Sequence, residues 1–256
     1  MTDGGLKNKV AIVTGAGQGI GLEICVQLAK HGVHVVLNDI QESLAADAAK
    51  KITHEKGSCI PLAGDVSDPE FIEWMVRYSV SHFGKVDIAI ANAGITLFGN
   101  FFEYKPDDFY QVLRVNLGGS FFLAQASAKR MKEQGSGGKI LFMSSVTGQQ
   151  AHKNLAAYSM TKAGVQMLAK NLVIELAPLK INVNAIAPGA TLTERTLSEE
   201  GYEKTWQRLT PTGRASTVSD VAAAAVFLVS PAADQITGQT LVIDGGWSSI
   251  SPSPFE

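Results

Sequence analysis

Short β-branched runs alternate with helical stretches along the whole chain, and this alternation constrains the fold more than any other feature. Between the runs, apolar residues recur at helical spacing, as in the 41–56, 69–83, 106–134 and 156–176 segments. Strands separated by helices predict a parallel sheet with helices on both faces. No linker, repeat or low-complexity tract divides residues 1–256, so we expect one doubly wound α/β domain with a seven-stranded parallel sheet. The predicted strands are Val10–Thr14, His34–Asn38, Ser58–Leu62, Asp87–Ala91, Lys139–Met143, Ile181–Ile186 and Thr240–Ile243.

Composition excludes several classes of partner. A net charge of −2 with no basic stripe argues against nucleic acid and anionic membrane surfaces as partners. The first five residues contain no basic region followed by an apolar run, and the longest strongly apolar run, Val221–Val229, is half a membrane span, so we expect a cytoplasmic protein. The two cysteines, Cys25 and Cys59, lack zinc-ligand spacing, and no metal site is expected.

A glycine-rich string, Thr14-Gly-Ala-Gly-Gln-Gly-Ile-Gly21, joins the first predicted strand to the first helix. Its glycines are spaced G-x-x-x-G-x-G rather than the more common G-x-G-x-x-G. Glycines at such a junction let the backbone turn tightly and approach a pyrophosphate, which rests on the positive N-terminus of the helix. The position of the string inside a βαβ unit therefore predicts a dinucleotide site.

Asp39 follows the second predicted strand, where a carboxylate can hydrogen-bond an adenosine ribose and would repel a 2′-phosphate. No Arg or Lys lies between Val10 and Leu28 or directly after Asp39, so NAD is preferred to NADP. A plain turn residue is the alternative interpretation of Asp39, but it does not explain the missing basic group. Asp65 and Val66, at the end of the third strand, are placed to reach an adenine, although an ordinary strand-end carboxylate explains Asp65 equally well.

Tyr158 and Lys162 stand four residues apart in the predicted helix 156–176, so they share one helix face. An ammonium beside a phenol favours the phenolate, the form needed for general acid–base catalysis near neutral pH. A lone pair at this spacing is more often an ordinary helix face. Ser145, thirteen residues upstream of Tyr158, and the dinucleotide-type fold favour the catalytic interpretation.

With these motifs in this order, the chain resembles the short-chain dehydrogenase/reductases from Lys9 to about Gly246. The resemblance is carried by Thr14–Gly21, Asp65, Asn92-Ala93-Gly94, Asn116, Ser145, Tyr158-x-x-x-Lys162, Pro188-Gly189 and Asp244-Gly245-Gly246. It implies a Rossmann domain and a catalytic tetrad of Asn116, Ser145, Tyr158 and Lys162, in which Asn116 anchors a water beside Lys162.

The resemblance also implies a set of cofactor-binding residues. The glycine loop would bind the pyrophosphate. The end of the second strand would bind the adenosine ribose, and the end of the third strand would contact the adenine. The threonines after Pro188-Gly189 would bind the nicotinamide carboxamide. Gln18 stands where NADP-using relatives often have Arg, which again favours NAD. The expected residues are Gly15, Gln18, Gly19, Ile20, Gly21, Asp39, Ile40, Asp65, Val66, Asn92, Ala93, Gly94, Tyr158, Lys162, Pro188, Gly189, Thr191 and Thr193. The 179–184 segment carries Lys and Asn where relatives often have Gly and Arg, a difference we expect to lie on the surface.

The implied reaction is NAD-dependent oxidation of a secondary alcohol or hemiacetal. Tyr158 would take the hydroxyl proton, and Ser145 would hold the substrate oxygen. The loop between these two residues contains Gln150, His152 and Asn154, whose polarity suits an aldose or polyol rather than a steroid, unless the side chains simply face solvent. Further along the chain, Phe98, Phe101 and Phe102 either wall the pocket or pack in the core, with core packing preferred.

Two alternative functions stay open. A 3-oxoacyl thioester reductase has a similar overall pattern, but biosynthetic reductases commonly use NADP, whereas Asp39 favours NAD. A catalytically silent dinucleotide-binding scaffold would be expected to lose part of the tetrad, and all four positions are present here. The sequence therefore favours an enzyme acting on a small-molecule substrate.

The longest interruption of the pattern, residues 190–214, follows the sixth strand and has little apolar periodicity. Long loops at the carboxyl edge of such sheets usually serve the ligand site, so we expect a substrate lid, with a plain surface excursion as the alternative.

Helices 116–132 and 156–176 carry apolar residues beyond one stripe, and Val221–Val229 with Thr240–Trp247 resembles a second interface. By resemblance, we expect a homotetramer.

Overall fold

Seven parallel strands form one sheet in the computed structural model, which describes residues 4–251. The strand order is β3-β2-β1-β4-β5-β6-β9, so the direction of winding reverses between β1 and β4, where ligands bind in sheets of this kind. The predicted fold class is confirmed, and no strand end differs from its predicted position by more than two residues. The strands are β1 Val10–Val13, β2 His34–Asp39, β3 Ser58–Ala63, β4 Ile88–Ala91, β5 Gly138–Met143, β6 Ile181–Pro188 and β9 Thr240–Ile243.

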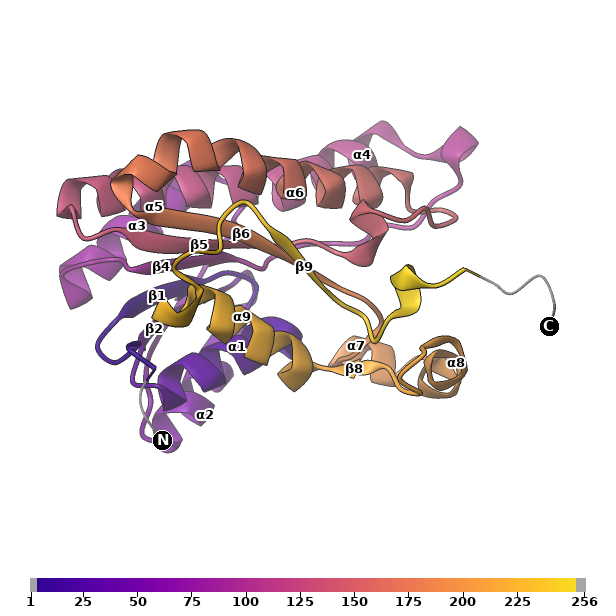
Figure 1. Ribbon diagram of the computed structural model, residues 1–256, viewed down its shortest axis with the longest axis horizontal. Helices are drawn as coiled ribbons and strands as arrows, with labels where there is room; N and C mark the ends of the chain where they lie inside the picture. Colours follow the sequence, from indigo (N-terminus) through magenta and orange to yellow (C-terminus); the bar gives the residue numbers. More distant parts are fainter. Residues whose placement is uncertain (1–3, 252–256) are drawn as a thin grey trace.

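Helices cover both faces of the sheet (Figure 1). One face is covered by α1 (Gly19–Lys30), α2 (Glu42–His54) and α9 (Val218–Val229), and the other by α3 (Pro69–Phe83), α5 (Gly119–Gln134) and α6 (Ala156–Leu176). Because strand side chains alternate, Ala11 and Val13 of β1 pack in the first layer and Ile12 in the second. Of the helices that the structure describes, none has both the length and the apolarity to cross a membrane.

The predicted helix 106–134 contains a wider turn in its middle. It begins as α4 (Pro106–Val112), becomes π-helical over η2 (Leu113–Gly118) and continues as α5. Asn116 lies in the π-helical part and is 1% exposed. Since single π-helical turns often mark functional sites, this irregularity places Asn116 in a special backbone environment that helical spacing alone did not predict.

The 190–214 segment is more regular than the sequence indicated. It contains β7 (Thr191–Leu192), which pairs with β8 (Ser216–Thr217), and two short helices, α7 (Glu194–Leu197) and α8 (Tyr202–Leu209). Helices this short have too few turns for apolar residues to recur visibly at helical spacing. The sequence of the segment therefore resembles that of an irregular loop.

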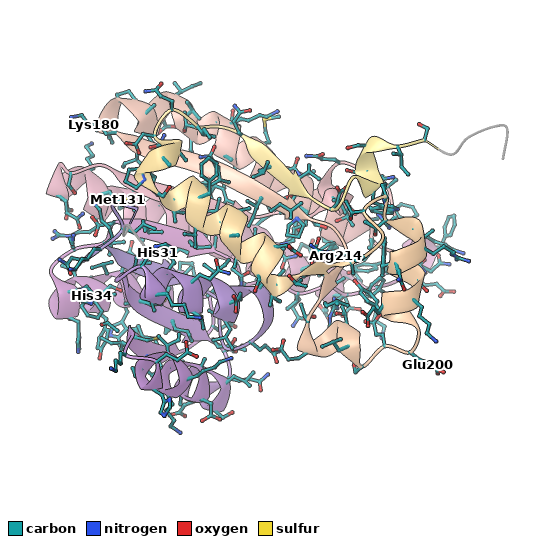
Figure 2. The ribbon with its side chains drawn as sticks, turned by 60° about the horizontal axis from the view of Figure 1, so that its bottom comes forward. His31, His34, Met131, Lys180, Glu200 and Arg214 are labelled. Carbon is teal, nitrogen blue, oxygen red and sulfur yellow. The ribbon has the colours of Figure 1, made fainter. Side chains whose placement is uncertain are left out.

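A bidentate ion pair fixes the end of this segment. Arg214 Nη1 and Nη2 lie 2.6 and 3.0 Å from the two carboxylate oxygens of Asp220 in α9. The hydrogen bonds from Arg214 are the main cause that holds the pKa of Asp220 far below its usual range. Figure 2 shows Glu200 at the side of the molecule away from His31, Met131 and Lys180, with Arg214 nearer the middle. Because β7 pairs with β8, the segment leaves and rejoins the body at neighbouring points.

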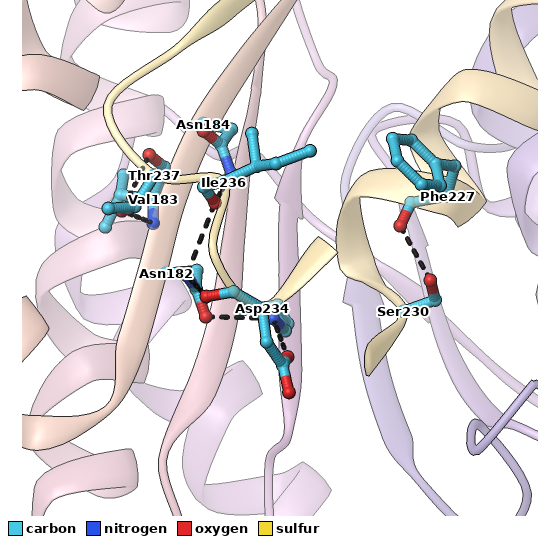
Figure 3. A network of polar contacts seen from close by, with 9 residues as sticks. Asn182, Val183, Asn184, Phe227, Ser230, Asp234, Ile236 and Thr237 are labelled. Atoms are coloured by element: carbon cyan, nitrogen blue, oxygen red, sulfur yellow. Dashed lines mark hydrogen bonds and ion pairs between the residues drawn. The ribbon is translucent and has the colours of Figure 1, made fainter. Parts of the chain in front are cut away.

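The expectation that the 179–184 departures lie on the surface is wrong for the asparagines. Asn182 is half-buried and Asn184 is buried, and both hold the connection that leads into β9 (Figure 3). Asn182 Nδ2 donates to the carbonyl of Asp234 (2.9 Å), and Asn184 Nδ2 donates to that of Ile236 (2.8 Å). The backbone of Val183, between the two asparagines, also bonds this connection, through Thr237 Oγ1 and Gly238 N, so side chains and backbone of β6 hold it together.

Candidate active site

Tyr158 and Lys162 project from the same face of α6, as predicted. The Lys162 side chain is buried, with the residue 4% exposed, and its Nζ lies 5.4 Å from the centre of the Tyr158 ring. Nζ also donates a 2.8 Å hydrogen bond to the carbonyl oxygen of Met143 at the end of β5. A buried ammonium is costly without partners, so the strand end and the aromatic ring together hold the charge in place.

Ser145 lies two residues after the end of β5 and caps a short turn, η3 (Val146–Gly148). Its Oγ accepts a 3.2 Å hydrogen bond from Thr147 N. Ser144 fastens the same stretch to α6, because its Oγ donates to the carbonyl of Lys162 (2.8 Å) and accepts from Gln166 Nε2 (2.8 Å). Ser144 and Gln166 were missed by the sequence, since neither has a motif of its own. They keep the loop that carries Ser145 against the helix that carries Tyr158 and Lys162.

The Asn116 side chain connects the loop that follows β4 with helix α6. Its Oδ1 accepts from Ile95 N (2.9 Å), and its Nδ2 donates to Ile95 O (3.0 Å) and to Thr161 Oγ1 (3.1 Å). Thr161 Oγ1 in turn donates to the carbonyl of Tyr158 (2.6 Å). Both amide protons of Asn116 are therefore used, and a water beside Lys162 would have to be held through an oxygen. Thr161, three residues after Tyr158, links Asn116 to the Tyr158 backbone, and the sequence did not indicate this role.

Gly94 leaves space between the two buried polar groups. A methyl group at this position would lie 3.2 Å from Lys162 Nζ and 3.3 Å from Asn116 Oδ1. Any larger side chain would displace one of them. Two of the four predicted tetrad members, Asn116 and Lys162, thus lie next to a glycine, and Tyr158 lies beside Lys162.

The glycine loop packs tightly against the turn that follows β4. Gly15 has a φ of +57°, and a methyl group there would lie 2.7 Å from Ala93 Cα. Asn92 Nδ2 donates to the carbonyls of Thr14 (2.9 Å) and Gly15 (2.7 Å), and a methyl on Gly21 would lie 2.5 Å from that same nitrogen. The loop therefore needs glycine for contact with the protein itself, and Asn92 holds its shape.

The start of α1 fits the anionic part of a dinucleotide. Gln18 precedes the helix but its side chain makes no capping hydrogen bond, so the first-turn amides of Gly19, Ile20 and Gly21 lack that partner. Gly19 has a φ of +60°, and a methyl group there would meet nothing nearer than 3.6 Å. Helix N-terminal amides without a side-chain cap are the surroundings that a pyrophosphate requires, and the atoms nearest to Gly19 here belong to Thr193 and Glu194.

Asp39 is placed beside this loop. It is 8% exposed, and its two carboxylate oxygens accept hydrogen bonds from Gly17 N (3.0 Å) and Gln41 N (3.0 Å). The next residue, Ile40, is 65% exposed. The carboxylate thus has a fixed position at the end of β2, with an uncovered apolar side chain next to it, which fits the adenosine half of a dinucleotide.

The remaining predicted cofactor residues differ in whether their side chains are exposed and whether they already have hydrogen-bond partners. Asp65 is exposed and its Oδ1 accepts from Ser67 N (2.8 Å), which agrees with the ordinary strand-end carboxylate that the sequence also allowed, and Val66 is buried. Thr191 is buried and donates to the carbonyl of Gly189 (3.1 Å), the residue after Pro188. Thr193 caps α7 through its hydroxyl. Both threonine hydroxyls therefore have partners within the protein.

The three predicted substrate residues of the polar loop separate into two groups. Gln150 and Asn154 are exposed, which agrees with the solvent-facing alternative. His152 is half-buried, and its ring packs against Trp247 with a centroid separation of 5.2 Å. Its Nε2 is buried and has no hydrogen-bond partner among the described residues. Burial lowers the pKa of this imidazole, which favours the neutral ring.

An aromatic column links His152 to the 190–214 segment. Trp247, in the short helix η6 (Trp247–Ser249), is met edge-on by Trp206 of α8 at 5.0 Å, and Trp206 packs against Tyr202 at 6.1 Å. No spacing in the sequence indicates this column, because its members come from three segments far apart in the chain.

The preference for core packing of Phe98, Phe101 and Phe102 is wrong, since these are 66%, 76% and 92% exposed.

A separate cavity of about 560 Å³ opens at the other end of the sheet. Its lining includes Lys9 and Asp87, which form an ion pair at 3.2 Å, and Lys139 and Asp234, which form another at 2.6 Å. It lies at the amino ends of the strands, whereas ligands in such folds bind at the carboxyl ends. The site around Tyr158 is therefore the candidate active site.

Comparison with known proteins places this site in a family. The family model described as enoyl-(acyl carrier protein) reductase matches residues 15–248. The chain is 35% identical to an L-rhamnose 1-dehydrogenase (NAD(P)(+)) of Sphingomonas over 94% of this chain and 96% of the relative. It is 36% identical to a versicolorin reductase of Emericella nidulans, with the same shares covered.

Solved structures agree with these relatives. A short-chain type dehydrogenase/reductase from Mycobacterium marinum superposes with a TM-score of 0.91 at 31% identity, over 95% of this chain and 97% of the other. A gluconate 5-dehydrogenase from Burkholderia cenocepacia, in complex with NADP and tartrate, gives a TM-score of 0.91 at 34% identity, over 98% and 99%. Together with the geometry around Tyr158 and Lys162, these matches show that the chain is an oxidoreductase of the short-chain dehydrogenase/reductase family, acting on a CH–OH group.

Proposed function

We propose that this protein is an NAD-dependent dehydrogenase that oxidises a hydroxyl or hemiacetal group of an aldose or polyol. The observation that carries the substrate class is the buried Nε2 of His152, which has no partner among the described residues and lies on the loop between Ser145 and Tyr158. A buried polar atom without a hydrogen bond costs about 1–3 kcal/mol, which a second substrate hydroxyl would offset. The sugar dehydrogenases among the relatives support the same substrate class.

In the proposed mechanism the protein positions the substrate and moves one proton. When bound, a nicotinamide dinucleotide supplies the hydride acceptor. Ser145 holds the reacting oxygen, and Tyr158 takes its proton. The positive charge of Lys162, 5.4 Å from the Tyr158 ring centre, stabilises the negative charge on the phenolic oxygen. Asn116 bonds the Ile95 backbone and Thr161, and so holds the loop that follows β4 in place against α6.

Replacing His152 with phenylalanine tests the substrate class. The phenyl ring keeps the contact with Trp247 but has no nitrogen, so kcat/KM for a reactive aldose is expected to fall by about 10-fold. Tetrahydropyran-2-ol, a hemiacetal without further hydroxyls, should be oxidised equally by variant and wild type. His54→Phe, an exposed histidine on α2, is the matched control. An equal loss for both substrates would mean that His152 only supports the fold.

NAD is the proposed cofactor, because the fixed carboxylate of Asp39 would repel the 2′-phosphate of NADP. Asp39→Asn removes the charge and keeps an oxygen that can accept from Gly17 or Gln41. The ratio of kcat/KM for NAD to that for NADP is expected to fall by about 10- to 100-fold. Because both cofactors are measured on one variant, any loss of stability cancels from the ratio. An unchanged ratio would contradict the role given to Asp39.

We also propose that residues 1–256 form a single domain, with the 190–214 segment as a substrate lid. In the described arrangement Trp206 of this segment packs on Trp247, which in turn covers one side of His152. Opening of the segment would separate Trp206 from Trp247 and let a substrate approach Nε2. Limited proteolysis with and without NAD and sugar measures this opening, and equal cleavage within 190–214 in both states would contradict it.

A cytoplasmic homotetramer is the proposed assembly. Apolar side chains of α5 and α6 are uncovered in the single chain, among them Phe121, Met167 and Ile174, and so are Phe227 of α9 and Leu241 of β9. Two separate uncovered patches suit two kinds of subunit contact. Analytical ultracentrifugation gives the mass directly, and a particle of 27.2 kDa would contradict the proposal.

The function as a whole is tested by absorbance at 340 nm with NAD and a panel of aldoses, polyols and hydroxyacyl esters. We expect turnover of an aldose or polyol. Turnover of hydroxyacyl esters alone would favour the acyl thioester reductase alternative. Silence across the panel with NAD binding intact would favour a dinucleotide-binding scaffold.

A further inference from the structure

We infer that Glu194 competes with the pyrophosphate for the start of α1, and so sets how tightly the enzyme binds its dinucleotide. Glu194 is the first residue of α7, in the 190–214 segment. A methyl group on Gly19 would lie 3.6 Å from Glu194 Oε2 and 3.7 Å from Thr193 Cγ2. The carboxylate therefore faces the glycine that opens α1.

The first turn of α1 carries no negative group of its own, and the Asp39 carboxylate is bonded to Gly17 N, before the helix begins. The Gln18 side chain makes no capping hydrogen bond, and no acidic residue lies in the first turn. A helix N-terminus carries a partial positive charge, so an anion nearby is stabilising. Glu194 takes part in none of the ion pairs found between the described residues. Apart from its place in the first turn of its own helix α7, the charge of Glu194 is thus directed toward the start of α1.

The carboxylate is held near this position by the structure of its own segment. Thr193 and Thr196 form a reciprocal cap at the start of α7, and Thr196 Oγ1 donates to the carbonyl of Thr191 (2.8 Å). Thr191 pairs in turn with Ser216 through the β7–β8 ladder. Because the backbone of Glu194 is fixed in this way, the charge can leave only by rotation of its exposed side chain or by movement of the whole segment.

A pyrophosphate on the same helix end would lie close to this carboxylate, and two like charges at short range repel each other. Binding of the dinucleotide must therefore displace Glu194, and part of the binding free energy is used for that displacement. In the protein without dinucleotide, the contact between Glu194 and the start of α1 is favourable and stabilises the helix. This inference rests on dinucleotide binding by the family site and does not depend on which alcohol is the substrate.

Glu194→Gln tests the inference because it removes the charge and keeps the shape. The Kd for NAD, measured by quenching of tryptophan fluorescence without substrate, is expected to fall by about 3- to 10-fold at low ionic strength. The difference should vanish near 1 M salt, where the screening length is about 3 Å. The Tm of the dinucleotide-free variant should be lower by about 1–3 °C, because a favourable helix-end interaction is lost.

Glu200→Gln is the matched control, because Glu200 is an exposed glutamate of the same segment. It should change neither the Kd nor the Tm. An unchanged or higher Kd in Glu194→Gln would overturn the inference, and so would a lower Kd that does not depend on salt. Absence of NAD binding to the wild-type protein would overturn it together with the cofactor assignment. Failure of every sugar to react, with the Kd effect present, would reject the proposed substrate class and leave the role of Glu194 standing.

Discussion

Tyr158→Phe is expected to lower kcat by about 10²–10⁴-fold, the usual contribution of a positioned acid–base group, with little change in the Kd for NAD. Phenylalanine lacks the hydroxyl that takes the substrate proton but fills the same space on α6. Lys162 Nζ keeps its hydrogen bond to Met143 O, and the ring that lies 5.4 Å away remains aromatic. The variant should therefore fold and bind NAD normally while losing turnover.

Stopped-flow measurement of NADH formation separates the chemical step from release of products. Tyr110→Phe is the matched control, since Tyr110 is an exposed phenol on the neighbouring helix α4. It should have wild-type kinetics. Near-normal turnover by Tyr158→Phe would reject Tyr158 as the acid–base group and, with it, the mechanism proposed for this site.

Lys162→Met is expected to have the second largest effect, a loss of about 10²–10³-fold in kcat, the range found when one group that stabilises developing charge is removed. Methionine fits the buried position but carries no charge and no donor. The negative charge on Tyr158 then loses its nearest cation, and the Met143 carbonyl loses the partner at 2.8 Å. The KM for NAD should also rise, because the family resemblance implies that Lys162 is also one of the cofactor-binding residues.

Lys170→Met, an exposed lysine two turns further along α6, is the control for the loss of a lysine from this helix. It should leave both kcat and the KM for NAD unchanged. Circular dichroism and Tm decide whether Lys162→Met is folded. A folded variant with wild-type kcat would show that the buried charge serves the structure and not the reaction.

Much of this site could be predicted because its signals are local. Tyr158 and Lys162 share a helix face through their spacing of four residues, and the boundaries of α6 agree with the predicted 156–176 segment. The glycine string between β1 and α1, and the position of Asp39 at the end of β2, follow from the order of strand, turn and helix. In a parallel sheet the carboxyl ends of all strands lie along one edge. Motifs that follow different strands are therefore expected to lie close together at that edge.

Other features could not be predicted because they depend on contacts between distant segments. The polar loop of Gln150, His152 and Asn154 gave three equal candidates, and only packing against Trp247 distinguishes His152 from the two exposed residues. Phe98, Phe101 and Phe102 have core-like chemistry but lie on the surface, since burial is decided by what covers a side chain. Asn182 and Asn184 show the converse, because their polar side chains are typical of a surface but are covered by the connection that leads into β9.

By itself, the sequence determined the fold class, the dinucleotide-binding loop and the shared face of Tyr158 and Lys162, because strand and helix periods and turn chemistry act over a few residues. The tertiary structure decided how those pieces are held. It placed Lys162 Nζ on the carbonyl of Met143, used both amide protons of Asn116, and brought Glu194 to the start of α1. These arrangements depend on how loops of different strands pack at one sheet edge, where the distance between two groups is unrelated to their separation along the chain.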